Sequence, residues 1–256
     1  NSNLKDTTVN GSLGVTGDQN VGGSSTITGD QNVGGSSTIT GNSTVKGDLS
    51  VSGNSNLKDT TVNGSLGVTG DQNVGGSSTI TGDQNVGGSS TITGNSTVKG
   101  DSITEGNTTT NGNSTVKGDL SVSGNSNLKD TTVNGSLGIT GDQNIGGSST
   151  ITGNSTVKGD SITEGNTTTN GNSTVKGDLS VSGNSNLKDT TVNGSLGVTG
   201  DQNVGGSSTI TGNSTVKGDS ITEGNTTTNG NSTVKGDLSV SGNSNLKDTT
   251  VNGSLG

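Results

Sequence analysis

Several residue types are missing altogether from this chain. Among its 256 residues there is no Phe, Tyr, Trp, His, Cys, Met or Pro, and only 19% are hydrophobic. Because an ordinary domain is nearly half apolar, this chain cannot fill a broad globular core. Without His or Cys it lacks the usual general base and the thiol nucleophile, and its redox compartment cannot be read from thiols. The composition alone lies close to that of disordered chains.

The charges and the apolar residues exclude further classes. The net charge of −9 is modest for this length, and the twelve cations are all Lys, spread along the chain without a basic patch. With no aromatic ring to stack on bases, we expect no nucleic-acid binding. No apolar run approaches the ~20 residues of a membrane span, so we expect no membrane insertion. Paired carboxylates would need a pocket that small side chains do not build. We expect no enzyme, no catalytic, cofactor-binding or metal-binding residues, and no cofactor.

What the chain does contain is a six-residue repeat. Most of it divides into hexads with one aliphatic residue and, two residues later, Gly followed by Asp, Asn or Ser, as in NSTVKG and DLSVSG. The aliphatic residues Val45, Val51 and Leu57 are six apart, and the series resumes at Val62 after a single step of five, inside NLKDTTV. Internal repetition of this kind decides the architecture.

This period fits neither an amphipathic helix nor a hairpin, and it predicts an all-β solenoid. Each hexad would form a short strand centred on its inward aliphatic residue and then a corner. We expect the corner Gly to adopt left-handed dihedrals and the neighbouring Ser and Thr to form hydroxyl ladders between layers. Three hexads would make one triangular coil of about 18 residues.

Hexads such as VNGSLG and VKGDLS, in which an aliphatic residue is followed two positions later by Gly, resemble the hexapeptide repeats of left-handed β-helices. The chain resembles even more the repeats of bacteriophage tail-fibre shafts and bacterial surface fibres. This resemblance implies an extracellular or virion-borne structural fibre. Hexapeptide acyltransferases share the coil, but they use a catalytic His, and this chain has none.

Longer blocks are built from the hexad. NSNLKDTTVNGSLG begins at positions 1, 54, 125, 184 and 243, so that the spacings are multiples of six less one. The first and last fourteen residues are identical, and we interpret the chain as a piece of a longer fibre. As domain organisation we predict one continuous β-solenoid shaft over residues 1–256.

Two stacking schemes remain open. If one chain coils alone, residue i lies on i+18, and Asp83, Asp101 and Asp119 form a column of like charges, which is unfavourable. If three chains interleave, the offset is six and no Asp lies on another Asp. The charge pattern therefore favours a homotrimeric, triple-stranded β-helix, with a single-chain β-helix as the alternative.

Some features allow several interpretations. The Asp column could bridge calcium in a single-chain coil. Thr-rich hexads suggest ice binding, although we expect no continuous Thr array on any face. Sequons at Asn42, Asn95 and Asn107 follow from Asn-rich corners. In SITEGN, Thr104 falls where an aliphatic residue should point inward, and Ile103 falls one place early. Either the core is locally polar or the register slips at Ile103, and we favour the slip.

The sequence thus predicts a rigid extracellular shaft that holds a tip at a distance and associates with itself, as a homotrimer or end to end. The alternatives are a single-chain solenoid filament or adhesin at a cell surface, an ice-binding solenoid, and a disordered polar linker. Against the linker, an unstructured chain has no reason to keep a six-residue phase.

Overall fold

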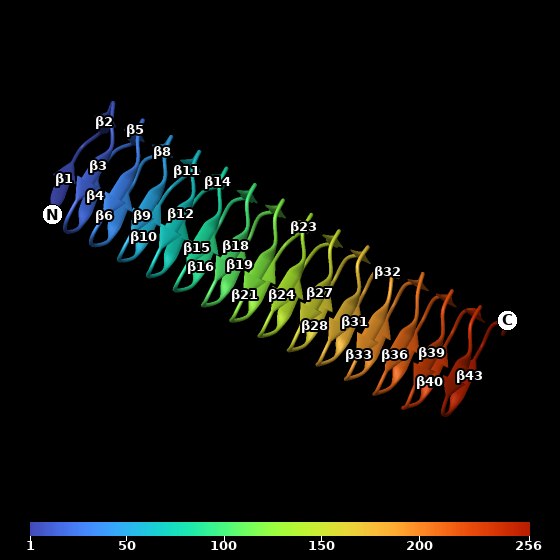
Figure 1. The fold of residues 1–256 in the computed structure, drawn as a ribbon. Helices are drawn as coiled ribbons and strands as arrows, with labels where there is room; N and C mark the ends of the chain where they lie inside the picture. The colour runs from blue at the N-terminus through green and yellow to red at the C-terminus, as the bar shows by residue number, and fades with distance from the viewer. The chain divides into compact units, whose positions relative to one another are not determined.

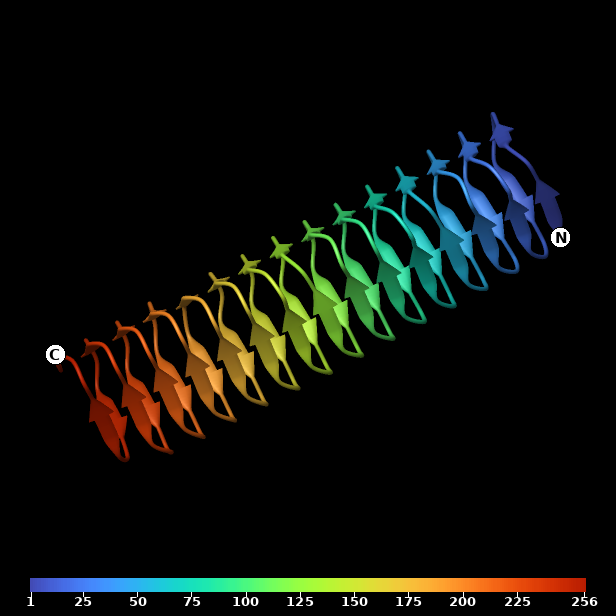
Figure 2. The same cartoon turned by 180° about the vertical axis from the view of Figure 1, so that it is seen from behind.

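The computed structural model describes all 256 residues and is entirely β. The chain divides into two compact units, Asn1–Lys129 (unit 1) and Asp130–Gly256 (unit 2), and each is described by itself. Within each unit the chain winds in successive coils, and the coils contribute strands of three residues to three parallel sheets (Figure 1, and Figure 2 from behind). The predicted β-solenoid is confirmed.

Each sheet of unit 1 is named after its first strand. The β1 sheet contains β1 (Ser2–Leu4), β4 (Gln19–Val21), β7 (Ser37–Ile39), β10 (Ser55–Leu57), β13 (Gln72–Val74), β16 (Ser90–Ile92), β19 (Thr108–Thr110) and β22 (Ser126–Leu128). The β2 sheet contains β2 (Thr7–Val9), β5 (Ser25–Ile27), β8 (Ser43–Val45), β11 (Thr60–Val62), β14 (Ser78–Ile80), β17 (Ser96–Val98) and β20 (Ser114–Val116). The β3 sheet contains β3 (Leu13–Val15), β6 (Gln31–Val33), β9 (Leu49–Val51), β12 (Leu66–Val68), β15 (Gln84–Val86), β18 (Ser102–Thr104) and β21 (Leu120–Val122).

Unit 2 has the same three-sided arrangement. Its β23 sheet contains β23 (Thr131–Val133), β26 (Ser149–Ile151), β29 (Thr167–Thr169), β32 (Ser185–Leu187), β35 (Gln202–Val204), β38 (Ser220–Thr222) and β41 (Leu238–Val240). Its β24 sheet contains β24 (Leu137–Ile139), β27 (Ser155–Val157), β30 (Ser173–Val175), β33 (Thr190–Val192), β36 (Ser208–Ile210), β39 (Thr226–Thr228) and β42 (Ser244–Leu246). Its β25 sheet contains β25 (Gln143–Ile145), β28 (Ser161–Thr163), β31 (Leu179–Val181), β34 (Leu196–Val198), β37 (Ser214–Val216), β40 (Ser232–Val234) and β43 (Thr249–Val251).

The residues that stack on one another in adjacent coils are 18 positions apart. Thr79 of β14, for example, lies opposite Thr97 of β17. Where a coil contains the five-residue step, the offset falls to 17, as for Asn56 of β10 and Asn73 of β13. The prediction of three hexads per coil is confirmed, and the five-residue step in NLKDTTV makes its coil one residue shorter.

Each interior strand buries its first and third residues and turns its middle residue outward. In β14, Ser78 and Ile80 are buried and Thr79 is exposed. The third residues form most of the apolar core and include Val45, Val51 and Leu57, so the predicted inward aliphatic rows are confirmed. The strand is not centred on the aliphatic residue, however, but ends on it. Because side chains alternate along a strand, two of the three residues then point to the axis.

The corner glycines are explained by close approach between coils. No residue has a positive φ, so the predicted left-handed corner is wrong. A Cβ on Gly100 would lie 2.7 Å from the carbonyl oxygen of Gly82 in the preceding coil and would overlap the carboxylate of Asp83. The Gly100 N–H also donates to that Gly82 oxygen at 3.1 Å. Gly is needed here because successive coils touch through their corner backbones.

The SITEGN hexads stay in register, so the predicted slip is wrong. Thr104 is only 2% exposed at the inward third position, whereas Ile103 is 44% exposed on the outside. β18 pairs with both β15 and β21. A slip of one residue would disrupt this pairing on both sides, which costs more than leaving one Ile half in water. The core is locally polar at these coils.

Within each unit, coils of one chain stack on each other with an offset of 18 or 17 residues, as the single-chain scheme requires. The homotrimeric scheme, in which neighbouring chains stack with an offset of six, stays a prediction.

Candidate functional site

The groups that could carry chemistry do not converge. No group of three or more acidic side chains lies close enough together to hold a metal ion. All regular elements are strands, so the structure contains no apolar helix of membrane-spanning length. The distinctive surface features are instead two repeated rows, the corner ladders and the outward middle residues, and one hollow on the β3 sheet.

The corner residues that follow Gly form a ladder of hydrogen bonds between coils. The Oδ1 atom of Asp83 accepts a hydrogen bond from the backbone N–H of Asp101 at 2.9 Å, and Oδ1 of Asp101 accepts one from Asp119 at 2.8 Å. Asn and Ser do the same, as in the bond from Asn113 N–H to Oδ1 of Asn95. Short side chains with an oxygen acceptor are therefore required here, which explains the sequence choice of Asp, Asn or Ser.

These ladders explain how the column of Asp residues is tolerated. Asp83, Asp101 and Asp119 do stack, as the single-chain scheme predicts, and their repulsion is opposed by charge-assisted hydrogen bonds to the backbone. The Oδ1 atoms of these carboxylates therefore have a structural role, since they accept hydrogen bonds from the backbone of the next coil. The sequence predicted hydroxyl ladders for the Ser and Thr beside the inward aliphatic residue, whereas the ladders seen at the corners run from side chain to backbone. The sequon residues Asn95 and Asn107 belong to the same exposed rows.

Asp101 permits a direct test of this ladder. Asp101→Ala should lower the free energy of unfolding by about 1 kcal/mol, because the N–H of Asp119 loses its acceptor. Asp101→Asn keeps an oxygen acceptor and removes one charge from the column, so stability should stay within about 0.5 kcal/mol of the parent chain. Urea unfolding followed by circular dichroism measures both. Equal losses in the two variants would contradict the ladder.

The sequence did not predict a second inward row, which is formed by the first residue of each strand. The first residue of each strand is Ser, Gln, Thr or Leu, and in the interior coils it is buried, as for Gln19 at 0% exposure. Gln31 donates from Nε2 to Oε1 of Gln19 at 2.6 Å, which joins two sheets across the coil. The signal was present in the sequence, because a residue of this set always stands two positions before the inward aliphatic residue or its Thr replacement.

The outward middle residues form an unbroken Thr row on one sheet of unit 1. Every strand of the β2 sheet has Thr at its centre: Thr8, Thr26, Thr44, Thr61, Thr79, Thr97 and Thr115. In unit 2 a similar row crosses the β24 sheet from β27 to β39. The expectation that no Thr array persists on any face is therefore wrong. Hexads of different sequence share Thr at the outward position, and only the three-sided coil brings them together.

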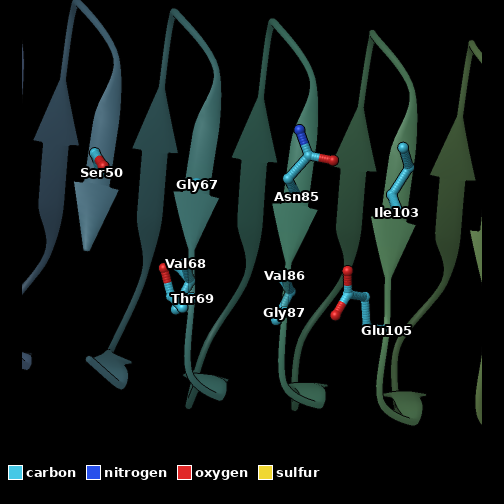
Figure 3. Close-up of a pocket in the computed structure, with 9 residues that line it drawn as sticks. All are labelled: Ser50, Gly67, Val68, Thr69, Asn85, Val86, Gly87, Ile103 and Glu105. Atoms are coloured by element: carbon cyan, nitrogen blue, oxygen red, sulfur yellow. The ribbon is translucent and has the colours of Figure 1, made fainter. Parts of the chain in front are cut away.

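A hollow of about 360 Å³ opens on the β3 sheet of unit 1 (Figure 3). Ser50, Gly67, Asn85 and Ile103 lie on successive strands, at their outward middle positions. Thr69, Gly87 and Glu105 line it beyond the ends of the same strands. Gly67, which has no side chain, lies among the residues that line the hollow.

Comparison with known proteins found no matching family model, no similar curated protein and no similar solved structure.

Proposed function

We propose that the chain is the structural shaft of an extracellular or virion-borne fibre, a rigid spacer for a tip that lies outside this sequence. The observation that supports this proposal is the repeat itself. Within each unit, interior strands pair with the coil before and the coil after, and the corner ladder repeats with the same offset. Such an array resists bending because each coil is held on both faces, and its length can change by whole coils.

Changing the number of coils tests the shaft. Residues 83–100 make one coil of 18 residues, and three additional tandem copies inserted after Gly100 keep every strand in phase. The longest dimension in small-angle X-ray scattering should increase by about 14 Å, since each coil adds about 4.8 Å. An insertion of nine residues is the control, since it places a corner where a strand must pair and should lower stability. An unchanged longest dimension after the three-coil insertion would contradict a rigid spacer.

The assembly of this shaft is tested by mass. The charge pattern predicts a homotrimer, so the soluble fibre should have the mass of three chains in sedimentation equilibrium. A stable monomer would overturn the homotrimer and support a single-chain filament or adhesin. The corner ladders favour the latter, because each chain then satisfies its own backbone.

The Thr row favours ice binding as a second candidate function. On the β2 sheet, Thr hydroxyl and methyl groups repeat at the strand spacing of about 4.8 Å. If this row binds ice, the chain should show thermal hysteresis, and Thr79→Lys should reduce it. Thr91→Lys on the β1 sheet, where the outward row is mixed, is the matched control. If the parent chain shows no thermal hysteresis, ice binding is ruled out.

A further inference from the structure

Gly67 occupies a position where the fold does not require Gly. Nothing lies within 4 Å of a Cβ built on it, whereas a Cβ on a corner residue such as Gly100 would overlap the preceding coil. Its φ is not positive either. Gly at the centre of a strand lowers stability by roughly 0.5–1 kcal/mol and often marks a place where another molecule approaches closely. Packing within the chain therefore does not explain why this outward position is Gly, which leaves a notch in the surface.

An exposed apolar side chain stands beside this notch. Ile103 lies two strands further along the same outward row, with Asn85 midway between them. It is 44% exposed, and the hollow extends from the notch to its side chain (Figure 3). A protruding Ile and a missing side chain thus share one surface at a fixed separation of two coils, about 9.6 Å.

The same combination occurs in unit 2. On the β25 sheet, Ile162 is 46% exposed, and Gly197 lies two strands away with Ser180 between them. A Cβ on Gly197 also meets nothing within 4 Å. Gly67 and Ile103 are 36 residues apart, but Ile162 and Gly197 are only 35 apart, because the five-residue step falls between them. In unit 1 the Gly therefore precedes the Ile in the sequence, whereas in unit 2 the Ile precedes the Gly, and the two spacings differ by one residue.

We propose that this surface binds a second copy of the chain, antiparallel and related by a two-fold axis at Asn85. In that arrangement Ile103 of each copy fills the notch at Gly67 of the other, and the two Asn85 side chains face each other. Such an interface is self-complementary, since one residue pair occurs twice. In unit 2, Ile162 and Gly197 pair in the same way about Ser180.

The polar residues on this surface also fit the antiparallel arrangement. Thr69 and Glu105 follow their strands by the same number of residues as each other, so the two-fold axis brings Glu105 of one copy to Thr69 of the other. The carboxylate can accept a hydrogen bond from that hydroxyl. Glu164 and Thr199 hold the equivalent positions in unit 2. A parallel pair about an axis along the coils would instead place Ile103 against Ile103.

Single cysteines test the geometry, because the chain has none of its own. Asn85→Cys should form an intermolecular disulfide quickly under mild oxidation, since the two residues face each other. Asn73→Cys, at the same hexad position on the β1 sheet, is the matched control and should react slowly. Ile103→Cys alone should also react slowly, but mixed with Gly67→Cys it should form the mixed dimer. Equal rates for Asn85→Cys and Asn73→Cys, or fast dimerisation of Ile103→Cys alone, would overturn the proposal.

Association in solution gives a second test. Each contact is small, so association should be weak and dependent on concentration in sedimentation velocity. The double variant Ile103→Ser and Ile162→Ser should weaken it at least about tenfold, because the buried apolar area is lost. Gly67→Thr fills the notch and should weaken association while it maintains the melting temperature. Gly14→Thr, on the same sheet but without an Ile two strands beyond it, should change nothing. If the Ile and Gly67 substitutions leave association unchanged, the proposal is wrong. This includes the case in which the parent chain and all variants have the mass of three chains.

Discussion

Gly100→Val should lower the free energy of unfolding by about 3 kcal/mol or more. The new side chain would meet the backbone carbonyl of Gly82 and the carboxylate of Asp83. The carboxylate can move, but the carbonyl belongs to the preceding corner and accepts the Gly100 N–H. The coils would have to separate locally, and overpacking that shifts the backbone costs about 1–3 kcal/mol and sometimes more. Urea or thermal unfolding measures the loss.

Gly67→Ala is the control for this prediction. It places the same kind of new carbon on a Gly whose surroundings are open, at the centre of a strand. Stability should rise by up to about 1 kcal/mol, because Ala loses less backbone entropy on folding. A similar effect of Gly100→Val and Gly67→Ala would show that close approach of the corners is not the reason for Gly.

The second large effect is expected at Ile80. This side chain has 0% exposure, at the inward end of β14. Ile80→Ala should lower the free energy of unfolding by about 2–5 kcal/mol, because buried apolar area is lost and a cavity remains. The narrow core has no large side chain that could fill it. Denaturant unfolding, followed by circular dichroism, gives the value.

Ile103→Ala is the matched control, since it changes the same residue type at an outward position. It should alter stability by no more than about 0.5 kcal/mol at concentrations where the chain is monomeric. The comparison also tests the register of the SITEGN hexads. If they slipped, Ile103 would point inward and its loss would cost as much as that of Ile80.

The fold could be predicted because its main determinant is local and repeated. A hexad with one aliphatic residue and a corner Gly predicts short strands, three to a coil, and the five-residue step at Asp59 accounts for the 17-residue offset in the structure. The alternation within a strand was harder to predict. Ser78 and Gln19 are polar, and polarity alone does not indicate that a side chain points to the axis.

The candidate surfaces depend on residues from distant hexads. Thr79 and Thr97 are both outward, but that they belong to one row follows only when every coil contains three strands. The hollow requires Gly67, Asn85 and Ile103 to lie on one sheet. Sequence reasoning placed Ile103 at a slip and so missed this surface.

The sequence by itself determined the period, the inward aliphatic rows and the change of length by whole hexads, because these follow from residue spacing along one strand and one corner. Only the tertiary structure decided why Gly and Asp stand at the corners, where Ile103 points, and which outward residues lie side by side. Those answers come from contacts between coils, where backbone pairing holds each strand in register and outweighs the local preference of any single side chain.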